Sequence, residues 1–118
     1  GLQPGDIGYI NAHGTGTDNN DLSEGRAIER LFGDRVPPVS STKPFTGHTT
    51  SAAGSTEAIL SILCLRHGVI WPNLNFSEPM EELDITPVRE LMTGVSPNAV
   101  MSNSFGFGGN DTSLIFKK

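Results

Sequence analysis

The sequence is poor in cysteine, in basic residues and in long apolar runs, and each shortage excludes a class of protein. A single cysteine among 118 residues excludes an internal disulfide and favours a reducing, cytoplasmic compartment. Only 8 lysines and arginines stand against 13 acidic residues, with no basic run, which argues against nucleic acid as a partner. No apolar stretch approaches the roughly 18 residues of a membrane span. The composition therefore indicates one globular domain, residues 1–118.

Glycine, by contrast, is abundant, and many of the 14 glycines lie in three polar loops. The loops are residues 11–17 (NAHGTGT), 41–48 (STKPFTGH) and 103–110 (NSFGFGGN). Two of the three histidines lie in the first two loops, where an extended segment ends. Loops that follow strands are where α/β enzymes place their chemistry, so we expect a functional site there.

Apolar periodicity predicts two helices, one from Asn20 or Asp21 to Phe32 and one from Ser51 to about His67. A glycine follows each helix and can end it. The second helix is apolar on most sides, which predicts that it is buried.

Extended segments are predicted at residues 7–12, 37–41, 69–71, 99–102 and 112–117. The last segment is expected to bury both of its faces. Two loops are predicted at residues 43–48 and 104–110, and the proline-containing residues 73–97 are predicted to form a long irregular surface excursion. This order of elements indicates an α/β fold in which a mixed sheet packs against helices.

His13, Lys43 and His48 carry the strongest chemical signal. His13 precedes a Gly-Thr-Gly-Thr run, so a neutral imidazole N–H can enter a cleft that the backbone also approaches closely. His48 precedes the small residues that open the second helix, and a helix N-terminus disfavours protonation of a nearby imidazole. Taken singly, each residue is equally well a loop or surface residue. Together, two neutral donors and a cation indicate a site that polarises a carbonyl and stabilises an enolate or oxyanion.

The third loop places two aromatic rings, Phe105 and Phe107, between glycines. Consecutive backbone N–H groups in such a turn can bind an oxyanion, and the rings expose apolar surface unless they line a pocket. The alternative is a glycine-rich hairpin whose rings cover the edge of the core. Thr15 and Thr17 add two hydroxyls for a polar ligand chain.

The acidic residues have plainer explanations. Asp21 and Glu24 lie in the first turn of a predicted helix and suit capping and the helix dipole. Glu57 lies inside an apolar helix and must therefore be paired or hydrogen-bonded. Cys64 lies between two leucines in mid-helix and is interpreted as a core residue. No ligand spacing for a metal is present.

The three loops resemble, in order and spacing, the signature loops of the elongating β-ketoacyl-acyl-carrier-protein synthases of the thiolase-like superfamily. The resemblance runs from about residue 6 to residue 116 and concerns the C-terminal part of that fold, an incomplete half of a layered α/β/α/β/α architecture. It implies a Cys-His-His site that joins an acyl-enzyme to malonyl-carrier protein, with no cofactor beyond the phosphopantetheine arm of the substrate. It also implies a cytoplasmic enzyme of fatty-acid or polyketide-like synthesis, a homodimer or heterodimer at full length, whose partner is acyl carrier protein.

The resemblance implies roles residue by residue. His13 and His48 would hydrogen-bond the malonyl thioester carbonyl, and Lys43 would support them. Thr15 and Thr17 would contact the pantetheine arm, and Phe105 and Phe107 would belong to a gating loop with the Phe107 N–H in the oxyanion hole. The acidic positions would be structural, and in some relatives a cation lies near three of the matching residues. The structural acids are Asp21, Glu24 and Glu57, and the residues near the cation are Asn11, Glu57 and Asn103.

No residue matches the family's nucleophilic cysteine, which lies in its N-terminal half. We therefore expect the isolated chain to be inactive in condensation and to associate through uncovered faces. The alternatives are a non-catalytic chain-length-factor-like subunit of a heterodimer, a thiolase acting on coenzyme A esters, and a carrier-protein binding module that uses three arginines near the first helix. Retention of both histidines and the lysine argues against the first, and the lack of a cysteine near residues 103–110 against the second. The three arginines, Arg26, Arg30 and Arg35, are also an ordinary solvated face.

Overall fold

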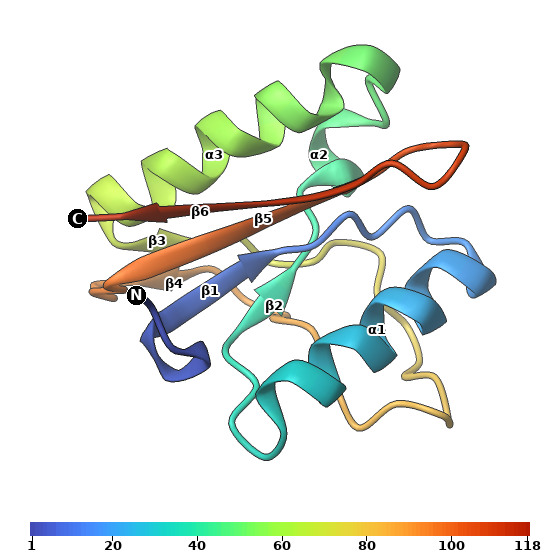
Figure 1. The fold of residues 1–118 in the computed structure, drawn as a ribbon, viewed down its shortest axis with the longest axis horizontal. Helices are drawn as coiled ribbons and strands as arrows, with labels where there is room; N and C mark the ends of the chain where they lie inside the picture. Colours follow the sequence, from blue (N-terminus) through green and yellow to red (C-terminus); the bar gives the residue numbers. More distant parts are fainter.

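The computed structural model describes residues 1–118 and is built on a four-stranded mixed sheet (Figure 1). The strands are β1 (Ile7–Asn11), β2 (Val39–Ser40), β5 (Ala99–Phe105) and β6 (Asp111–Lys117). Their order across the sheet is β2-β1-β5-β6, with β1 parallel to both β2 and β5 and β6 antiparallel to β5. The predicted mixed sheet is therefore confirmed.

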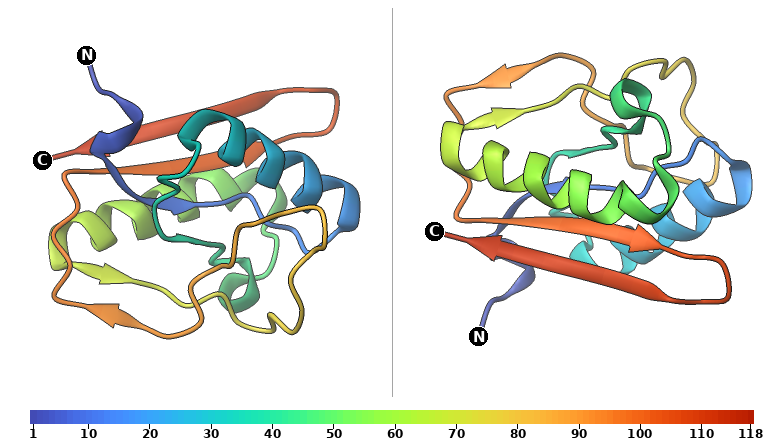
Figure 2. Two further views of the ribbon diagram at one scale, coloured as in Figure 1. Left: turned by 90° about the horizontal axis from the view of Figure 1, so that it is seen from below. Right: turned by 90° about the horizontal axis from the view of Figure 1, so that it is seen from above.

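Two long helices cover opposite faces of this sheet (Figures 1 and 2). Alternate residues of the strands feed two separate cores, as the two-residue repeat of a strand requires. One core joins β1, β2 and β5 to α1 (Asp18–Phe32), and includes Ile10, Met101 and Ile28. The other joins Tyr9 and Val100 to α3 (Ala53–His67).

The helix boundaries refine the sequence predictions. Helix α1 begins at Asp18 instead of residue 20 or 21, because Thr17 already has the extended backbone of an N-cap position. Gly33 and Gly68 follow the two helices with positive φ, as predicted. The long apolar segment opens with a 3₁₀ turn, η2 (Thr50–Ala52), before α3, and another turn, η1 (Pro4–Asp6), precedes β1.

The prediction of a loop at residues 43–48 is wrong for its first part, because Lys43–Thr46 forms a short helix, α2. The proline stands in the first turn of α2, where its missing N–H costs nothing. Two short strands, β3 (Val69–Ile70) and β4 (Met92–Thr93), pair in an antiparallel ladder, so residues 73–97 are not wholly irregular.

Between β3 and β4 the chain runs over the β2 edge of the sheet as a strap, defined here as residues 73–91. The Val88 N–H donates to the Val39 carbonyl at 2.9 Å, and the Asn73 N–H donates to the Val88 carbonyl at 2.7 Å. The Asp84 N–H donates to Glu29 of α1 at 2.6 Å, which fixes the far end of the strap. The strap therefore covers an edge that would otherwise be open to pairing.

Two burial predictions are wrong. Helix α3 is buried only on its sheet side, and its outward face leaves apolar side chains exposed, with Ile59 59% and Ile62 43% accessible. Strand β6 is exposed along almost its whole length instead of buried on both faces. Both segments have the expected apolar residues, but no other segment of the chain packs on their outward faces.

None of the helices has the length and apolar character needed to cross a membrane.

Candidate active site at the strand ends

The three sequence loops meet at one end of the sheet, because β1, β2 and β5 run parallel and end at the same edge. His13 lies two residues beyond β1, Lys43 opens α2 just after β2, and Phe105 ends β5. The His13 ring lies 5.5 Å from the His48 ring, edge to face at 87°, and 5.5 Å from the Phe105 ring. The structure thus brings together residues that are more than 90 positions apart in the sequence.

His13 is held neutral. Its side chain is buried, and desolvation together with the charge of Lys43 lowers the pKa of His13 to about 4. The Lys43 Nζ lies 3.3 Å from His13 Nδ1, and an ammonium has only protons to donate. Nδ1 therefore accepts, which leaves the single ring proton of His13 on Nε2.

His48 reaches the same tautomer by a different route. The Thr50 N–H donates to His48 Nδ1 at 3.2 Å, so a neutral His48 also carries its proton on Nε2. His48 is exposed and lies in the turn before η2, separated by several residues from the long helix that was predicted to begin next to it. The tautomer is thus set by the backbone N–H of the first residue of η2, the turn that leads into that helix.

Lys43 and Glu57 form a buried ion pair beneath the histidines. Lys43 Nζ donates to Glu57 Oε1, and both side chains are almost fully buried. The expectation that Glu57 must be paired inside its apolar helix is confirmed. Buried ions need their partner to offset desolvation, so this pair fixes Lys43 beside His13.

Glu24 acts as a clasp between the His13 loop and β5. Its Oε1 accepts from the His13 N–H at 3.0 Å and from Asn103 Nδ2 at 3.1 Å, and its Oε2 accepts from the Gly14 N–H at 3.0 Å. Burial raises the pKa of Glu24, although these hydrogen bonds oppose the rise. The capping role suggested for Glu24 is wrong, because this carboxylate binds the preceding loop and not the first turn of its own helix. Asp21 instead accepts from the Gly16 N–H at 3.3 Å.

A polar layer under the site was largely missed from the sequence. Asn11 Nδ2 lies within hydrogen-bond distance of Thr42 Oγ1 at 3.3 Å, of the Glu57 carbonyl at 3.3 Å and of Ser61 Oγ at 3.4 Å. Ser61 was the available signal, since it is the one polar residue in the apolar run of residues 58–65 within α3. Two buried oxygens in this region, Glu57 Oε2 and Ser102 Oγ, have no protein partner. No cluster of three or more His, Cys, Asp or Glu side chains is arranged for a metal ion.

A cleft of about 700 Å³ opens in front of the histidines. Both phenylalanines line it: Phe105 packs beside His13, and Phe107 extends fully into solvent from the glycine turn. Thr15 and Thr17 line the same cleft and hydrogen-bond each other through their hydroxyls at 2.8 Å. Phe105 fits the pocket-lining interpretation, whereas the Phe107 ring borders the cleft but leaves its apolar surface exposed.

Cys64 lies outside this cleft. It is on the sheet-facing side of α3, where it is fully buried, and burial raises its pKa to about 11. A thiol with that pKa is protonated at neutral pH and is a poor nucleophile. The interpretation of Cys64 as a core residue is confirmed.

Comparison with known proteins agrees with this geometry. Residues 1–77 match the family model described as β-ketoacyl synthase, C-terminal domain. The chain is 48% identical to 3-oxoacyl-[acyl-carrier-protein] synthase 1 of Escherichia coli K12 over 95% of its length, and 44% identical to synthase 2 of Vibrio harveyi, also over 95%. It spans only 28% of the length of either relative.

Solved structures give the same answer. A β-ketoacyl synthase from Burkholderia phymatum superposes with a TM-score of 0.89 at 40% identity, over 99% of this chain and 29% of that one. A ketosynthase in complex with its chain length factor from Xenorhabdus doucetiae superposes with a TM-score of 0.78 at 43% identity, over 98% of this chain and 29% of that one. The chain therefore belongs to the β-ketoacyl synthase family, whose C-terminal domain it matches.

Proposed function

We propose that this chain forms the carbonyl-polarising part of a 3-oxoacyl-[acyl-carrier-protein] synthase. The observation that carries the proposal is the pair of imidazoles, His13 and His48, whose Nδ1 atoms are both occupied as acceptors, so that each offers a proton from Nε2. Two such donors beside one cleft suit a thioester oxygen on which negative charge develops. The relatives named above support the same reaction.

We propose the following reaction at this site. A malonyl thioester enters the cleft with its carbonyl oxygen on the two Nε2 protons. The bond from the malonyl α-carbon to its carboxylate breaks, CO₂ leaves, and the electron pair moves onto the thioester oxygen as an enolate. The enolate carbon then attacks the carbonyl of an acyl-enzyme thioester, and the thiolate leaves as the new carbon–carbon bond closes. The histidines stabilise the charge in the first step without changing their protonation state.

Lys43 supports this step as a fixed positive charge. It lies against His13 Nδ1 and is anchored by Glu57, so it keeps the His13 proton on Nε2 and opposes protonation of the ring. We propose no direct contact between Lys43 and the substrate, because the ammonium is buried.

The walls of the cleft suit a long flexible substrate arm. We propose that Thr15 and Thr17 contact the phosphopantetheine arm of acyl carrier protein. Phe105 and Phe107 would form the gate, and the Phe107 N–H would donate to the oxyanion of the acyl-enzyme. The arm is part of the substrate, so the proposal requires no separate cofactor.

The acyl-enzyme needs a thiolate that these 118 residues do not provide, because Cys64 is buried with a raised pKa. We propose that it comes from the remainder of the enzyme, since the chain spans only 28% of its curated relatives. The full protein would then be a cytoplasmic dimer that acts with acyl carrier protein.

A structural cation fits the same proposal. The resemblance implies one near Asn11, Glu57 and Asn103, and oxygen is the donor that hard cations prefer. The unpartnered Glu57 Oε2 supports such a site, as does Ser102 Oγ. Lys43 already balances the charge of Glu57, so the cation would coordinate the unpartnered oxygens and take no part in the reaction.

The proposal is tested by malonyl decarboxylation in the enzyme that carries this chain, followed as CO₂ release from a malonyl thioester. We expect His13→Asn and His48→Asn each to lower the rate roughly 100-fold or more, because each removes one donor to the developing enolate. His67→Asn is the matched control, since His67 lies at the far end of α3 and outside the cleft. Decarboxylation that survives either site variant at the level of the control would contradict the proposal.

A chain-length-factor-like subunit is the second candidate, because one structural relative is a ketosynthase solved in complex with such a factor. That function predicts no decarboxylation by the protein without a ketosynthase partner, and a rate in the pair that does not change in His13→Asn or His48→Asn. The assembled site of His13, Lys43 and His48 favours the catalytic function.

A further inference from the structure

A second cavity lies behind the catalytic loop and shares no lining residue with the thioester cleft. It holds about 220 Å³, is partly open to solvent, and is bordered by α1, the ends of β1 and β2, and the strap. Cavities of roughly 150 Å³ with apolar walls already bind molecules the size of benzene. The space is therefore sufficient for a single ring with a short substituent.

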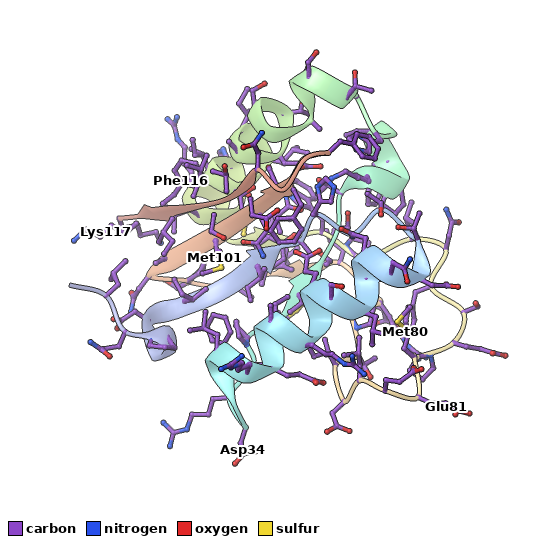
Figure 3. The ribbon with its side chains drawn as sticks, turned by 45° about the vertical axis from the view of Figure 1, so that its right-hand side comes forward. Asp34, Met80, Glu81, Met101, Phe116 and Lys117 are labelled. Atoms are coloured by element: carbon purple, nitrogen blue, oxygen red, sulfur yellow. The ribbon has the colours of Figure 1, made fainter.

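The walls of this cavity are apolar and adjustable. Ile28 of α1 and Val39 of β2 line the cavity, and Met80, Leu83 and Ile85 line it from the strap. Figure 3 shows Met80 between the strap and α1. Leu83 rests on Gly25, where an added Cβ would lie 2.3 Å from Leu83 Cδ1, so the glycine is what lets the strap close this tightly.

The polar lining is acidic. Three carboxylates, Asp21, Glu24 and Glu78, contribute to the wall, and no lysine, arginine or histidine does. The Glu24 carboxylate is nearly fully buried without a cationic partner, and its only compensation comes from neutral N–H donors. An entering cation would supply the missing charge, whereas an anion would be repelled.

We propose that this cavity is a binding site for a compact amphiphile that has an apolar body, such as a phenyl ring, and a cationic ammonium head directed toward Glu24. Nothing in the thioester chemistry requires the site, and its existence does not depend on the proposed function.

The site meets the catalytic loop directly, through Ala12 and Gly14 of its wall, and also through the Glu24 carboxylate. Glu24 lines the cavity and holds the N–H groups of His13 and Gly14. A cation beside Glu24 favours its ionised form, which is the form that accepts those hydrogen bonds. Occupation of the cavity would therefore stabilise the backbone that positions His13, and this coupling is the only part of the inference that rests on the proposed function.

The binding test titrates phenethylammonium into the enzyme that carries this chain, with 2-phenylethanol as the neutral isostere. We expect 2-phenylethanol to bind roughly fivefold more weakly, the loss of one partly screened ion pair. Leu83→Trp fills the cavity and should weaken phenethylammonium binding roughly tenfold or more, because a packed core leaves no room for a second ring. Equal affinity for the two probes, or unchanged binding to the folded tryptophan variant, would overturn the proposal.

A milder variant keeps the test decisive if Leu83→Trp does not fold. Glu78→Gln removes one carboxylate from the wall and should weaken phenethylammonium binding roughly twofold. Glu81→Gln is its matched control, because Glu81 points into solvent from the same strap (Figure 3). A loss of equal size in both variants would show attraction to the acidic surface at large and would overturn the site.

The coupling is read from the amide resonances of His13 and Gly14 during the same titration. Both should shift with the occupancy of the cavity, and Leu83→Trp should abolish the shift. Binding without any shift at these two amides overturns the coupling while leaving the binding site intact. A decarboxylation assay that fails would not affect either binding result.

Discussion

The protonation state of His13 follows from its neighbours more than from the ring itself. Desolvation and the adjacent Lys43 lower its pKa to about 4, whereas a free imidazole titrates near 6.5. The unfolded chain binds a proton at His13 as pH falls below about 6.5, and the folded chain does not until about 4. The folded state is therefore progressively destabilised between these two values, and no further below them.

This sets an expected pH profile for decarboxylation. The rate should hold as pH falls through 6 and decline only toward about 4, where His13 is protonated. Lys43→Met removes one of the causes of the low pKa, and should move the acid limb of the profile upward. The measurement is CO₂ release against pH for both proteins, normalised to the folded fraction. An acid limb at the same pH in both would contradict the role given to Lys43.

Lys43→Met also has a cost in stability. It leaves Glu57 buried without its counterion, and breaking a buried pair from one side costs about 3–5 kcal/mol. The double variant Lys43→Met/Glu57→Gln should recover a large part of this loss, because neither position of the pair then carries a charge. Urea unfolding of the single and double variants gives the comparison, and a double variant no more stable than the single one would refute the pairing argument.

Single residues of the site were predictable to different degrees. His13, Lys43 and His48 could be found because their chemistry lies within short glycine-containing loops. The clasp of Glu24 on Asn103 could not, since it joins positions 79 residues apart and depends on which strand lies beside β1. The tautomer of His48 could not be predicted from the sequence either, because it depends on a single hydrogen bond from the Thr50 backbone N–H.

At the scale of elements, Gly68 joins α3 to β3 in a way that no other residue can. Its φ of +66° is left-handed, and an added Cβ would lie 2.3 Å from the Val95 carbonyl oxygen. Gly68→Ala should destabilise the chain by more than about 1 kcal/mol, through backbone strain and the clash together. Gly16→Ala is a useful comparison, since it also has a positive φ but meets no atom within 4 Å. Equal losses in thermal unfolding would mean that the clash contributes nothing.

The sequence predicted most of the helices and strands, but it predicted neither their exact boundaries nor which of their surfaces other elements would bury. The apolar residues of the segment 51–67 predicted a helix, now α3. Because they lie on most sides of the helix, they did not show which side would pack against the sheet. Residues 43–46 were predicted as a loop from their composition, but they form helix α2, because a proline is well tolerated in the first turn of a helix. Strand β6 was predicted, but its exposure was not, because an apolar strand pattern does not show whether another element will pack on its faces.

For the whole molecule, the uncovered face of α3 has a direct consequence. Ile59, Ile62 and Leu63 expose an apolar surface on one side of the helix, and such surfaces drive association. The isolated chain should therefore associate with rising concentration, and Ile59→Lys/Ile62→Lys should reduce this. Leu31→Lys is the control, because Leu31 is 54% exposed but lies on α1 across the sheet. Sedimentation velocity that shows a monomer at all concentrations would refute the expectation.

The Glu24 clasp makes one amide proton a reporter for a distant movement. The Oε1 atom that accepts from the His13 N–H also holds Asn103, on the strand that carries Phe105 to the gate. We expect a displacement of that strand to pull on the shared carboxylate, to weaken its bond to the His13 amide and so to speed exchange of that amide with solvent deuterium. If Phe105 and Phe107 form the proposed gate, hydrogen exchange at residue 13 should report its opening, at a backbone atom outside the cleft.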